Sequence, residues 1–391
     1  MRLAWITPRF APEGIVGGAE TLIRHLASLA AEAGHEVHLL TTCARDHFTW
    51  ANDREPGEEQ VDGLHVHYFR VNEDRDVGRF LEVQHQIDRG REVSQEDQEA
   101  WVANSVCSRD LNAWLEAETL GLDAVLAGPY LFGLTVQASR ICQGKFWLVP
   151  CLHDEAFAQL EIIADMFRQA QGCLFNAEPE RQLATALYGL PADGNPVVGM
   201  ALDPFSSDGG GFRKERGLDK PYVLYCGRRE EGKNTHLLFE YLNTYLERRA
   251  DSVSVVLAGS GDLQPPDKLR PHIVDLGFVT EQEKYDAMAG ASVFIHPSTN
   301  ESFGIVLLEA WLAGTPAMVH DRGEVLRWQC ESSGGGLWFR YYPEFEAMLD
   351  LLLETPDLAG TMGEQGKQYV LNHYNRQAIS ERLLSALETA S

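Results

Sequence analysis

The chain carries the stretch Asn300-Glu301-Ser302-Phe303-Gly304-Ile305-Val306-Leu307-Leu308-Glu309-Ala310, in which two glutamates stand eight positions apart. Polar residues come first and an apolar, helix-forming run follows, so the pattern predicts a helix that begins near Phe303. The free N–H groups and the positive dipole end of such a helix attract a phosphate. Glu301 precedes the helix and Glu309 lies on its second turn, where a carboxylate can hold the hydroxyls of a ribose. The stretch therefore indicates a nucleotide-sugar site; the plainer alternative is a surface helix with two exposed glutamates.

This stretch resembles the E-x7-E motif of the family 4 retaining glycosyltransferases, which have the GT-B fold. In that family the first glutamate faces the donor sugar, the backbone after it approaches the sugar and the phosphate, and the second glutamate holds the ribose. The resemblance thus implies a catalytic role for Glu301. It also implies donor contacts from Ser302, Phe303, Gly304, Ile305 and Glu309.

Composition excludes several classes of partner. The chain has 391 residues, which suggests roughly two or three domains. Its net charge is −25 and its pI about 4.9. A surface this acidic repels nucleic-acid backbones, so nucleic-acid binding is not expected. The same charge disfavours anionic lipid surfaces, and a peripheral membrane contact is not indicated.

The cysteines point to a reducing compartment. There are seven, scattered and without a C-x-x-C pair, which argues against a disulfide framework and against a zinc site. Cys151 and Cys226 fall in strand-like apolar runs and are expected in the core. No apolar run reaches the ~18 residues of a membrane span, and the first residues are too short for a signal segment. We therefore expect a cytoplasmic protein without a metal site.

Apolar runs alternate with segments of helical period, a pattern typical of α/β units on parallel sheets. The predicted strands of the first half are 3–7, 37–41, 64–71, 124–127, 146–151, 173–175 and 196–199, and its predicted helices are 22–33, 131–142, 155–170 and 178–188. The predicted strands of the second half are 222–226, 253–258, 273–276, 293–296 and 317–319, and its predicted helices are 233–249, 281–290 and 303–313. Residues 44–62 and 72–100 are too polar for more than loops and a helix or two.

A composition break marks the middle of the chain. Residues 206–220 begin with Ser206-Ser207-Asp208-Gly209-Gly210-Gly211 and continue as a charged run, which predicts an interdomain linker. The alternative is a long surface loop inside one domain.

The family resemblance implies a GT-B architecture of two Rossmann-like, doubly wound domains that face a central cleft. On that basis we expect an acceptor-side domain at 1–205, the linker at 206–220 and a nucleotide-sugar-binding domain at 221–375. A final helix at 376–391 would cross back to the first domain, as it does in the family.

A glycine loop follows the first strand. Gly14-Ile15-Val16-Gly17-Gly18-Ala19-Glu20 lets a phosphate approach the backbone, although it is not the G-x-G-x-x-G of dinucleotide folds. The loop resembles the N-terminal GGAE loop of family 4 enzymes, which closes over the donor diphosphate. The resemblance implies donor contacts from Gly17 and Gly18.

A cationic loop follows the first strand of the second half. Gly227-Arg228-Arg229-Glu230-Glu231-Gly232-Lys233 offers a guanidinium fork and a lysine point charge, which suit a diphosphate. It resembles the family element G-R-x4-K, so Arg228 and Lys233 are expected catalytic groups and Gly227 a donor contact. Arg229 is an extra cation without an assigned role, and Asn234 stands where the family usually has glycine.

A histidine, His153, follows the predicted strand 146–151. His153 lies where side chains of an open α/β sheet face the ligand crevice. It matches the family position whose histidine approaches the donor sugar, which implies a catalytic role. Asp154 and Glu155 either orient His153 or cap the next helix, and capping is favoured.

Two glycine turns complete the resemblance. Gly259-Ser260-Gly261 resembles a family turn that contacts the donor, and Gly277-Phe278-Val279 resembles the stretch whose backbone recognises the nucleobase. Gly259, Phe278 and Val279 are therefore expected donor contacts. Trp50 and Trp101 lie in the divergent region, where they stack on a sugar or serve as packing residues.

Together these features predict a retaining, metal-independent hexosyltransferase. Its donor would be a nucleotide-diphospho-sugar, with a UDP- or GDP-sugar expected and no cofactor. The acceptor would be a glycan, a lipid-linked glycan or a small molecule, in glycan or cell-surface polysaccharide biosynthesis. The alternatives are a nucleotide-sugar 2-epimerase of the same fold and a non-catalytic protein that binds a nucleotide-sugar.

Overall fold

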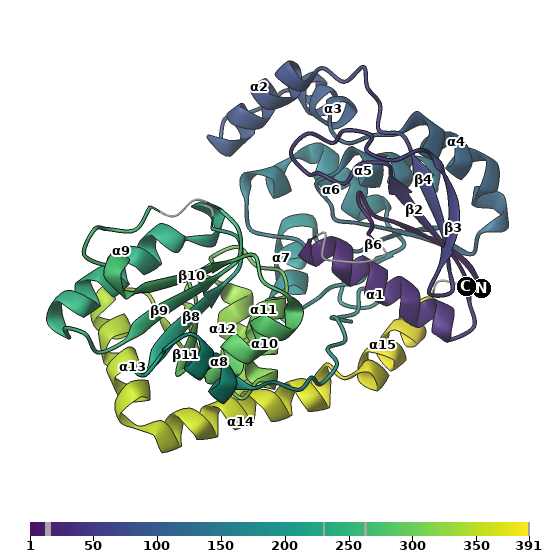
Figure 1. Cartoon of the computed structure of the whole chain (residues 1–391). Coiled ribbons are helices and arrows are strands. Elements are labelled where there is room, and N and C mark those ends of the chain that lie inside the picture. The colour runs from purple at the N-terminus through teal and green to yellow at the C-terminus, as the bar shows by residue number, and fades with distance from the viewer. Residues whose placement is uncertain (12–16, 230, 262–263, 390–391) are drawn as a thin grey trace. The chain divides into compact units, whose positions relative to one another are not determined.

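The computed structural model describes residues 1–11, 17–229, 231–261 and 264–389. The chain divides into two compact units, Met1–Ala201 with Gln377–Ser391, and Leu202–Arg376. Each unit is built on one sheet with helices packed against it (Figure 1). The predicted α/β class is therefore confirmed. Within the described residues, no helix has both the length and the apolar character needed to cross a membrane.

The sheet of the first unit has the strand order β3-β4-β2-β1-β5-β6-β7. Its strands are β1 (Arg2–Ile6), β2 (Glu36–Thr42), β3 (Gly57–Val61), β4 (Leu64–Phe69), β5 (Ala124–Ala127), β6 (Phe146–Leu148) and β7 (Gly172–Cys173). Only the edge strand β3 runs antiparallel to its neighbour. The predicted strand 196–199 is reduced to one parallel bridge between Val197 and Phe175.

Helices cover both faces of this sheet. The helix α1 (Gly18–Glu32) packs on β1, β2 and β4, and a second group of helices packs over the other face around a large apolar cluster. The remaining helices of the unit are α2 (Val77–Asp88), α3 (Gln95–Asn104), α4 (Arg109–Glu118), η1 (Thr119–Gly121), α5 (Gly133–Ile141), η2 (Ala156–Gln159), α6 (Glu161–Gln169), α7 (Glu178–Tyr188) and α15 (Arg376–Glu388). The two helices inside 72–100 bury only two or three side chains each, which explains their weak sequence pattern.

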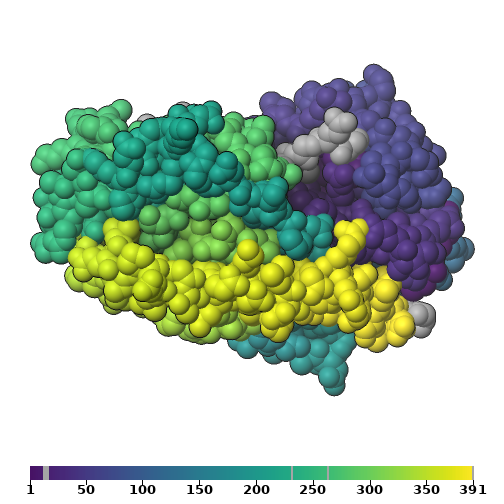
Figure 2. Space-filling model, turned by 60° about the horizontal axis from the view of Figure 1, so that its bottom comes forward, coloured from purple at the N-terminus to yellow at the C-terminus, as the bar shows by residue number. Residues whose placement is uncertain are grey.

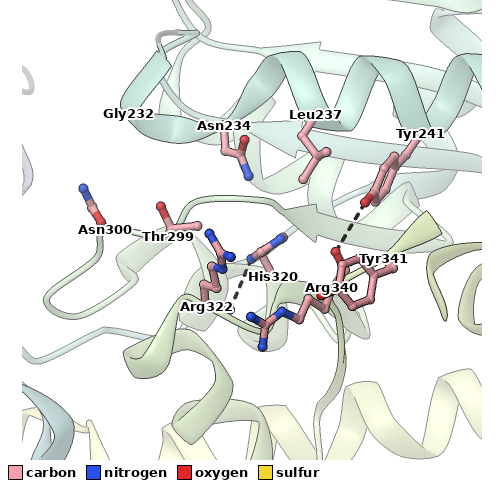
Figure 3. A pocket seen from close by; sticks show the side chains of 10 residues that line it. All are labelled: Gly232, Asn234, Leu237, Tyr241, Thr299, Asn300, His320, Arg322, Arg340 and Tyr341. Carbon is pink, nitrogen blue, oxygen red and sulfur yellow. Dashed lines mark hydrogen bonds between the residues drawn. The ribbon is translucent and has the colours of Figure 1, made fainter. Parts of the chain in front are cut away.

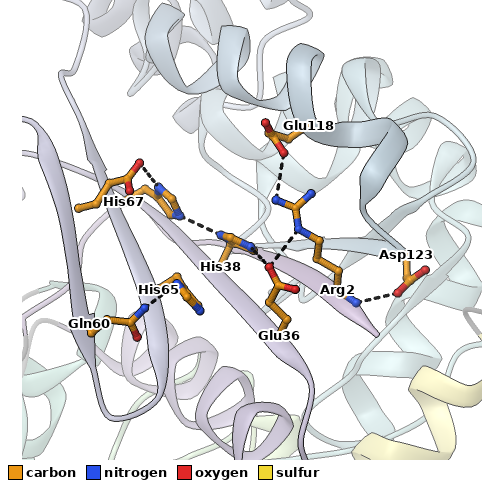
Figure 4. A network of polar contacts seen from close by, with 9 residues as sticks. Arg2, Glu36, His38, Gln60, His65, His67, Glu118 and Asp123 are labelled. Atoms are coloured by element: carbon orange, nitrogen blue, oxygen red, sulfur yellow. Dashed lines mark hydrogen bonds and ion pairs between the residues drawn. The ribbon is translucent and has the colours of Figure 1, made fainter.

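A polar network fastens the edge of the first sheet (Figure 4). His38 Nε2 lies 3.0 Å from the Glu36 carboxylate, and its Nδ1 lies 2.9 Å from Nε2 of His67. The other ring nitrogen of His67 lies 3.1 Å from Glu58. Burial lowers the pKa of His67. The line of contacts joins side chains of the neighbouring strands β2, β4 and β3.

The sheet of the second unit has the order β10-β9-β8-β11-β12-β13 and is wholly parallel. Its strands are β8 (Tyr222–Cys226), β9 (Ser254–Ala258), β10 (Ile273–Gly277), β11 (Val293–His296), β12 (Ala317–His320) and β13 (Gly336–Phe339). Its helices are α8 (Gly209–Glu215), η3 (Glu231–Lys233), α9 (Thr235–Arg248), η4 (Arg270–His272), α10 (Glu281–Gly290), α11 (Ile305–Leu312), α12 (Glu324–Ser333), α13 (Tyr342–Glu354) and α14 (Pro356–His373). The helices α9 and α13 cover one face, and α10, α11 and α12 cover the other.

The predicted linker 206–220 folds differently. It contains α8, whose start is capped by the Asp208 side chain accepting from the Gly211 N–H at 2.8 Å. A Cβ on Gly209 would overlap the backbone of Ala289 and Gly290, so this glycine lets α8 lie directly on α10. The division between the units falls earlier, between Ala201 and Leu202. Gly209 thus serves close packing rather than flexibility.

The helix α14 holds α11 in place. A Cβ on Gly363 would overlap the carbonyl of Gly314, and one on Gly366 would overlap the ring of Trp311. The Trp311 indole in turn donates to the Gly335 carbonyl at 2.9 Å. The outer side of α14 is part of the yellow band at the surface of this unit (Figure 2). Gly360 on this helix is exposed, and a Cβ added there would meet no atom within 4 Å.

This packing predicts opposite effects for two identical substitutions in one helix. Gly360→Ala should raise the free energy of unfolding by ~0.5–1 kcal/mol, because alanine favours the helix and meets no neighbour. Gly363→Ala should lower it by ~1–3 kcal/mol, because the new methyl forces α14 away from α11. Urea unfolding of both variants checks this, and equal effects would show that the helices do not pack through Gly363.

Candidate functional site

The carboxyl ends of β8, β9 and β10 meet through glycine. The Gly227 N–H donates to the Ala258 carbonyl at 2.9 Å, and the Gly259 N–H donates to the Gly277 carbonyl at 2.7 Å. Gly259 has φ 125°, and a Cβ there would overlap the Gly227 carbonyl. The predicted donor contacts Gly227 and Gly259 therefore lie side by side, at the edge where open α/β sheets bind ligands.

The loop after β8 is fixed by Arg229. Its buried guanidinium forms an ion pair with the exposed Asp275 on β10 and donates to the Gly261 carbonyl at 3.2 Å. This is the structural role of the cation that the sequence left unassigned. The neighbouring Arg228 is exposed, and its carbonyl accepts from the Tyr225 hydroxyl at 2.6 Å. Glu230 lies outside the described residues.

Lys233 and Glu301 are in direct contact. The Lys233 ammonium donates to Glu301 Oε1 at 2.5 Å, joining two loops that are 68 residues apart in the sequence. Asn234, in place of the family glycine, has φ 56° and donates from its side chain to the Pro297 carbonyl at 3.2 Å. Asparagine is one of the few residues that tolerate this left-handed conformation, so the loop keeps a glycine-like turn without glycine.

A buried histidine, which the sequence analysis did not select, backs Glu301. His296 Nε2 lies 3.4 Å from Glu301 Oε1, and its Nδ1 is buried without a hydrogen-bond partner in the described structure. Burial lowers the pKa of His296 to about 4, so its ring is neutral near pH 7. A neutral ring with hydrogen on Nε2 supports the carboxylate without adding a full charge.

The helix α11 begins two residues later than predicted. Gly304 has φ 84°, a left-handed conformation that cannot continue an α-helix, and the helix starts at Ile305. A Cβ on Gly304 would also press on Leu326. The Phe303 ring is buried against Tyr374, with ring centres 5.3 Å apart. Only the backbone of Phe303 is therefore placed to contact a ligand, as the resemblance implies.

Glu309 is buried, and one of its two carboxylate oxygens has a hydrogen-bond partner in the described residues. Its Oε1 accepts from the Lys284 ammonium at 2.6 Å, while its Oε2 is buried without a partner in the described residues. Burial raises the pKa of Glu309, against the opposing effect of Lys284. Sequence reasoning missed Lys284, because nothing in the α10 segment marks it as the partner of a residue on α11.

In the first unit, His153 is oriented by Glu155. The Glu155 carboxylate lies 3.6 Å from His153 Nδ1 and accepts from the Tyr130 hydroxyl at 2.6 Å. Burial opposes ionisation of Glu155, but the nearby His153 ring and the hydrogen bond from Tyr130 outweigh it and lower the pKa of that carboxyl. Glu155 makes no side-chain cap to the following helix, so the favoured capping interpretation is wrong.

A second buried carboxyl shapes the same loop. Glu180, near the start of α7, accepts from the backbone N–H of Leu152 at 2.7 Å and of Asn176 at 2.6 Å. Cys151 beside it has φ 52°, an uncommon conformation for a non-glycine residue. Burial raises the pKa of Glu180 to about 8. No sequence motif marks Glu180, because its partners are backbone groups.

The glycine loop is described from Gly17 onward, and Gly14, Ile15 and Val16 lie outside the described residues. Gly17 precedes α1, and a Cβ on it would overlap the carboxylate of Glu20. Glu20 is paired with the buried Arg9 at 2.7 Å. The glutamate of this loop is thus a structural partner of an arginine that the sequence analysis did not consider.

The two tryptophans of the divergent region are packing residues. Trp101 is buried between Phe80 and Phe157, and Trp50 is half-buried against Phe132. Phe278, in contrast, is 76% exposed directly after β10, where a nucleobase contact is predicted.

Residues 212–369 match the family described as glycosyl transferases group 1. This segment, which lies within the second unit, belongs to the group 1 glycosyl transferases. This confirms the family that the E-x7-E stretch indicated. The roles of the individual site residues stay predictions.

Most of the curated relatives match less than half of this chain. A glycosyltransferase of lipopolysaccharide core biosynthesis from Rhizobium meliloti, LpsE, is 27% identical over 43% of this chain and 50% of its own length. An uncharacterised glycosyltransferase of Methanocaldococcus jannaschii is 29% identical over 41% of this chain and 44% of its own. The matches thus span about half the length of these relatives. A glycogen synthase of Mycobacterium tuberculosis is 24% identical over 83% of this chain and 78% of its own length.

Solved structures share the fold over the whole chain. Sucrose-phosphate synthase from Thermosynechococcus elongatus has a TM-score of 0.74 at 17% identity, with 100% of both chains covered. Anabaena HepE has a TM-score of 0.71 at 18% identity, again over 100% of both chains. The predicted GT-B fold is confirmed.

His296 predicts a pH dependence of stability. Its pKa is about 4 in the folded chain and near 6.5 when unfolded, so the unfolded chain binds more protons between these values. Stability from this group is complete above about pH 6.5 and falls toward pH 4 by ~3 kcal/mol. His296→Gln should remove this dependence in denaturant unfolding measured across that range. His236→Gln, at an exposed position on α9, is the control, and identical pH profiles for all three proteins would refute the assignment.

The Lys284–Glu309 pair predicts a rescue. Lys284→Met leaves a buried carboxylate unpaired and should cost ~3–5 kcal/mol of unfolding free energy. Adding Glu309→Gln should restore most of that loss, because the uncompensated charge is gone. Lys268→Met, which breaks an exposed pair with Glu247, should change stability by less than ~1 kcal/mol. Urea unfolding measures all four proteins, and a double variant as unstable as Lys284→Met would contradict the pairing.

Proposed function

We propose that this protein is a retaining glycosyltransferase that moves a hexosyl unit from a nucleotide-diphospho-sugar to an acceptor hydroxyl. The observation that carries the proposal is the pair of carboxylates around the start of α11. Glu301 lies in the loop before the helix in contact with Lys233, and Glu309 lies inside the helix with one buried oxygen unpaired. A buried acceptor without a partner is costly, and a ribose hydroxyl of the donor would satisfy it.

Positive charge collects where the leaving diphosphate would lie. Arg228 and Lys233 follow β8, and the backbone N–H groups at the start of α11 add a positive dipole end. Groups fixed in this way stabilise charge that develops as the bond to the phosphate breaks. The proposal assigns the diphosphate to Arg228, Lys233, Ser302, Gly304 and Ile305.

The remaining donor contacts follow from exposure and chain position. Phe278 and Val279 lie beyond β10, where the exposed Phe278 ring offers a surface for a nucleobase. Gly227 and Gly259 let the donor approach the backbone closely. Structures of Anabaena HepE are described as complexes with UDP and with UDP-glucose, which favours a uridine donor over a guanosine donor here.

The proposal places the acceptor on the domain at 1–205, with 376–391 as part of that side and 221–375 as the donor side. Within the first unit, Arg382 on α15 donates to the Val198 carbonyl at 3.2 Å, which supports this grouping. His153, held by Glu155, and the glycines Gly17 and Gly18 would complete the donor site. Relatives named for lipopolysaccharide and phosphatidyl-inositol glycosylation favour a glycan or lipid-linked acceptor.

The chemistry proposed is transfer with retention. The bond from the anomeric carbon to the phosphate oxygen breaks, and the acceptor oxygen forms its bond on the same face. The leaving phosphate oxygen takes the acceptor proton. Glu301, already engaged by Lys233, positions the sugar and does not form a glycosyl-enzyme bond. We further propose a cytoplasmic location, because all seven cysteines are buried and form no disulfide, which suits a reducing compartment.

Nucleotide binding tests the donor site. Calorimetry with UDP, GDP, ADP and dTDP should show binding of UDP, and Glu309→Ala should weaken it at least about tenfold by removing the ribose acceptor. Glu240→Ala, at an exposed position on α9, is the matched control and should bind as the unchanged protein does. Absence of binding by any nucleotide would overturn the proposal.

Product analysis separates the alternatives. A donor sugar changed at carbon 2 without any acceptor would instead show an epimerase. Nucleotide-sugar binding without turnover toward any acceptor class would show a non-catalytic binder.

A further inference from the structure

A cavity opens in the second unit, next to the loops that carry Lys233 and Glu301. It has a volume of about 490 Å³ and lies at the carboxyl ends of β11, β12 and β13 (Figure 3). Asn300 and Gly232 line it on one side, so it borders the proposed donor site without using its charged groups. None of the nucleotide contacts proposed above lines this cavity.

The cavity is cationic in a strongly acidic chain. Arg322 and Arg340 come from the segments that follow β12 and β13, and both side chains line the cavity. No aspartate or glutamate is among its described lining residues. Asp321 lies 3.5 Å from Arg340 but is shared with Arg327 at 3.1 Å. The guanidinium of Arg322 makes no hydrogen bond or ion pair in the part of the chain that the structure describes.

Further donors point to an anionic ligand. His320 is buried, and its Nδ1 accepts from the Arg322 N–H at 3.2 Å, which leaves hydrogen on Nε2 in the neutral ring. Two guanidinium forks and this N–H form a donor set that suits the oxygens of a phosphate monoester. Two positive charges match the near-double charge of such a group better than the single charge of a carboxylate.

Two tyrosines of the cavity are suited to a sugar ring. Tyr241 from α9 and Tyr341 after β13 line the same cavity, and Tyr341 is 60% exposed. The Tyr241 hydroxyl donates to the Arg340 carbonyl at 3.3 Å, which fixes the ring beside the arginine. Asn234 keeps its amide oxygen as an acceptor, because its nitrogen donates to Pro297. An aromatic face, a hydroxyl acceptor and a cationic end lie within one volume that is typical of small-molecule sites.

We infer that this cavity binds a phosphorylated sugar, with the phosphate between Arg322 and Arg340 and the ring against Tyr241 and Tyr341. The ligand is distinct from the nucleotide-sugar of the proposed function. The two sites share no charged residue, so either can exist without the other.

The test is calorimetry on the full chain. The probes are glucose 6-phosphate, mannose 6-phosphate and glucose 1-phosphate, with glucose, glucuronate and inorganic phosphate for comparison. At least one sugar phosphate should bind, and more tightly than its unphosphorylated sugar, glucuronate or inorganic phosphate. Arg322→Gln should weaken that binding at least about tenfold.

Arg248→Gln is the matched control, because Arg248 is an exposed arginine on α9 that pairs with Glu346 and does not line the cavity. It should change the affinity less than about twofold. UDP binding should be the same in both variants and should not displace the sugar phosphate. Displacement by UDP, equal losses in both variants, or no binding of any sugar phosphate would overturn the inference. If inorganic phosphate bound as tightly as the sugar phosphates, the inference that the cavity recognises a sugar would be wrong. Loss of UDP binding alone would count only against the proposed function.

Discussion

Ion pairs between a carboxylate and a cation organise the edge of the second sheet. Asp275 takes Arg229, Glu301 takes Lys233 and Glu309 takes Lys284. Each pair joins two segments that follow or precede different strands, so the loops are fixed before a ligand arrives. Desolvating such pairs gains little net stability, but breaking one leaves an expensive lone charge. The loops of this edge therefore keep one arrangement, because any other would separate an ion pair and leave a charge without its partner.

The ends of the strands and the motif residues could be predicted from the sequence, but the residues that contact them could not. Glu301 and Lys233 were selected separately, and their contact could not be deduced because it joins loops of different strands. Lys284 could not be selected from the sequence, because its partner Glu309 lies on a different helix and the pair has no characteristic spacing. His296 was visible only as part of a strand end, and its importance comes from complete burial beside Glu301. Local pattern thus predicts which residues stand at the edge, and tertiary packing decides what each one touches.

Glycine was the least predictable residue type, because the same residue serves opposite purposes. The run Gly209–Gly211 has the composition of a flexible linker, yet Gly209 is where α8 lies directly on α10. Gly304 ends the loop before α11 by its left-handed backbone and so shifts the helix start from the predicted Phe303 to Ile305. A glycine in sequence shows that the backbone is unrestrained by a side chain. Whether that freedom is used for motion, for a turn or for contact depends on what lies opposite.

A net charge of −25 opposes the approach of any anionic ligand. Arginine and lysine side chains placed close to a binding site offset this repulsion there. At physiological salt, charges more than about 8 Å away are largely screened, so a bound phosphate responds mainly to the groups around it. Within the second unit, Arg228 and Lys233 stand after β8, while Arg322 and Arg340 stand after β12 and β13. Two separate cationic positions on one sheet edge can therefore bind two phosphates without sharing any charged residue. An acidic surface with cations confined to such positions favours ligands that fit them over polyanions that would spread across the whole face.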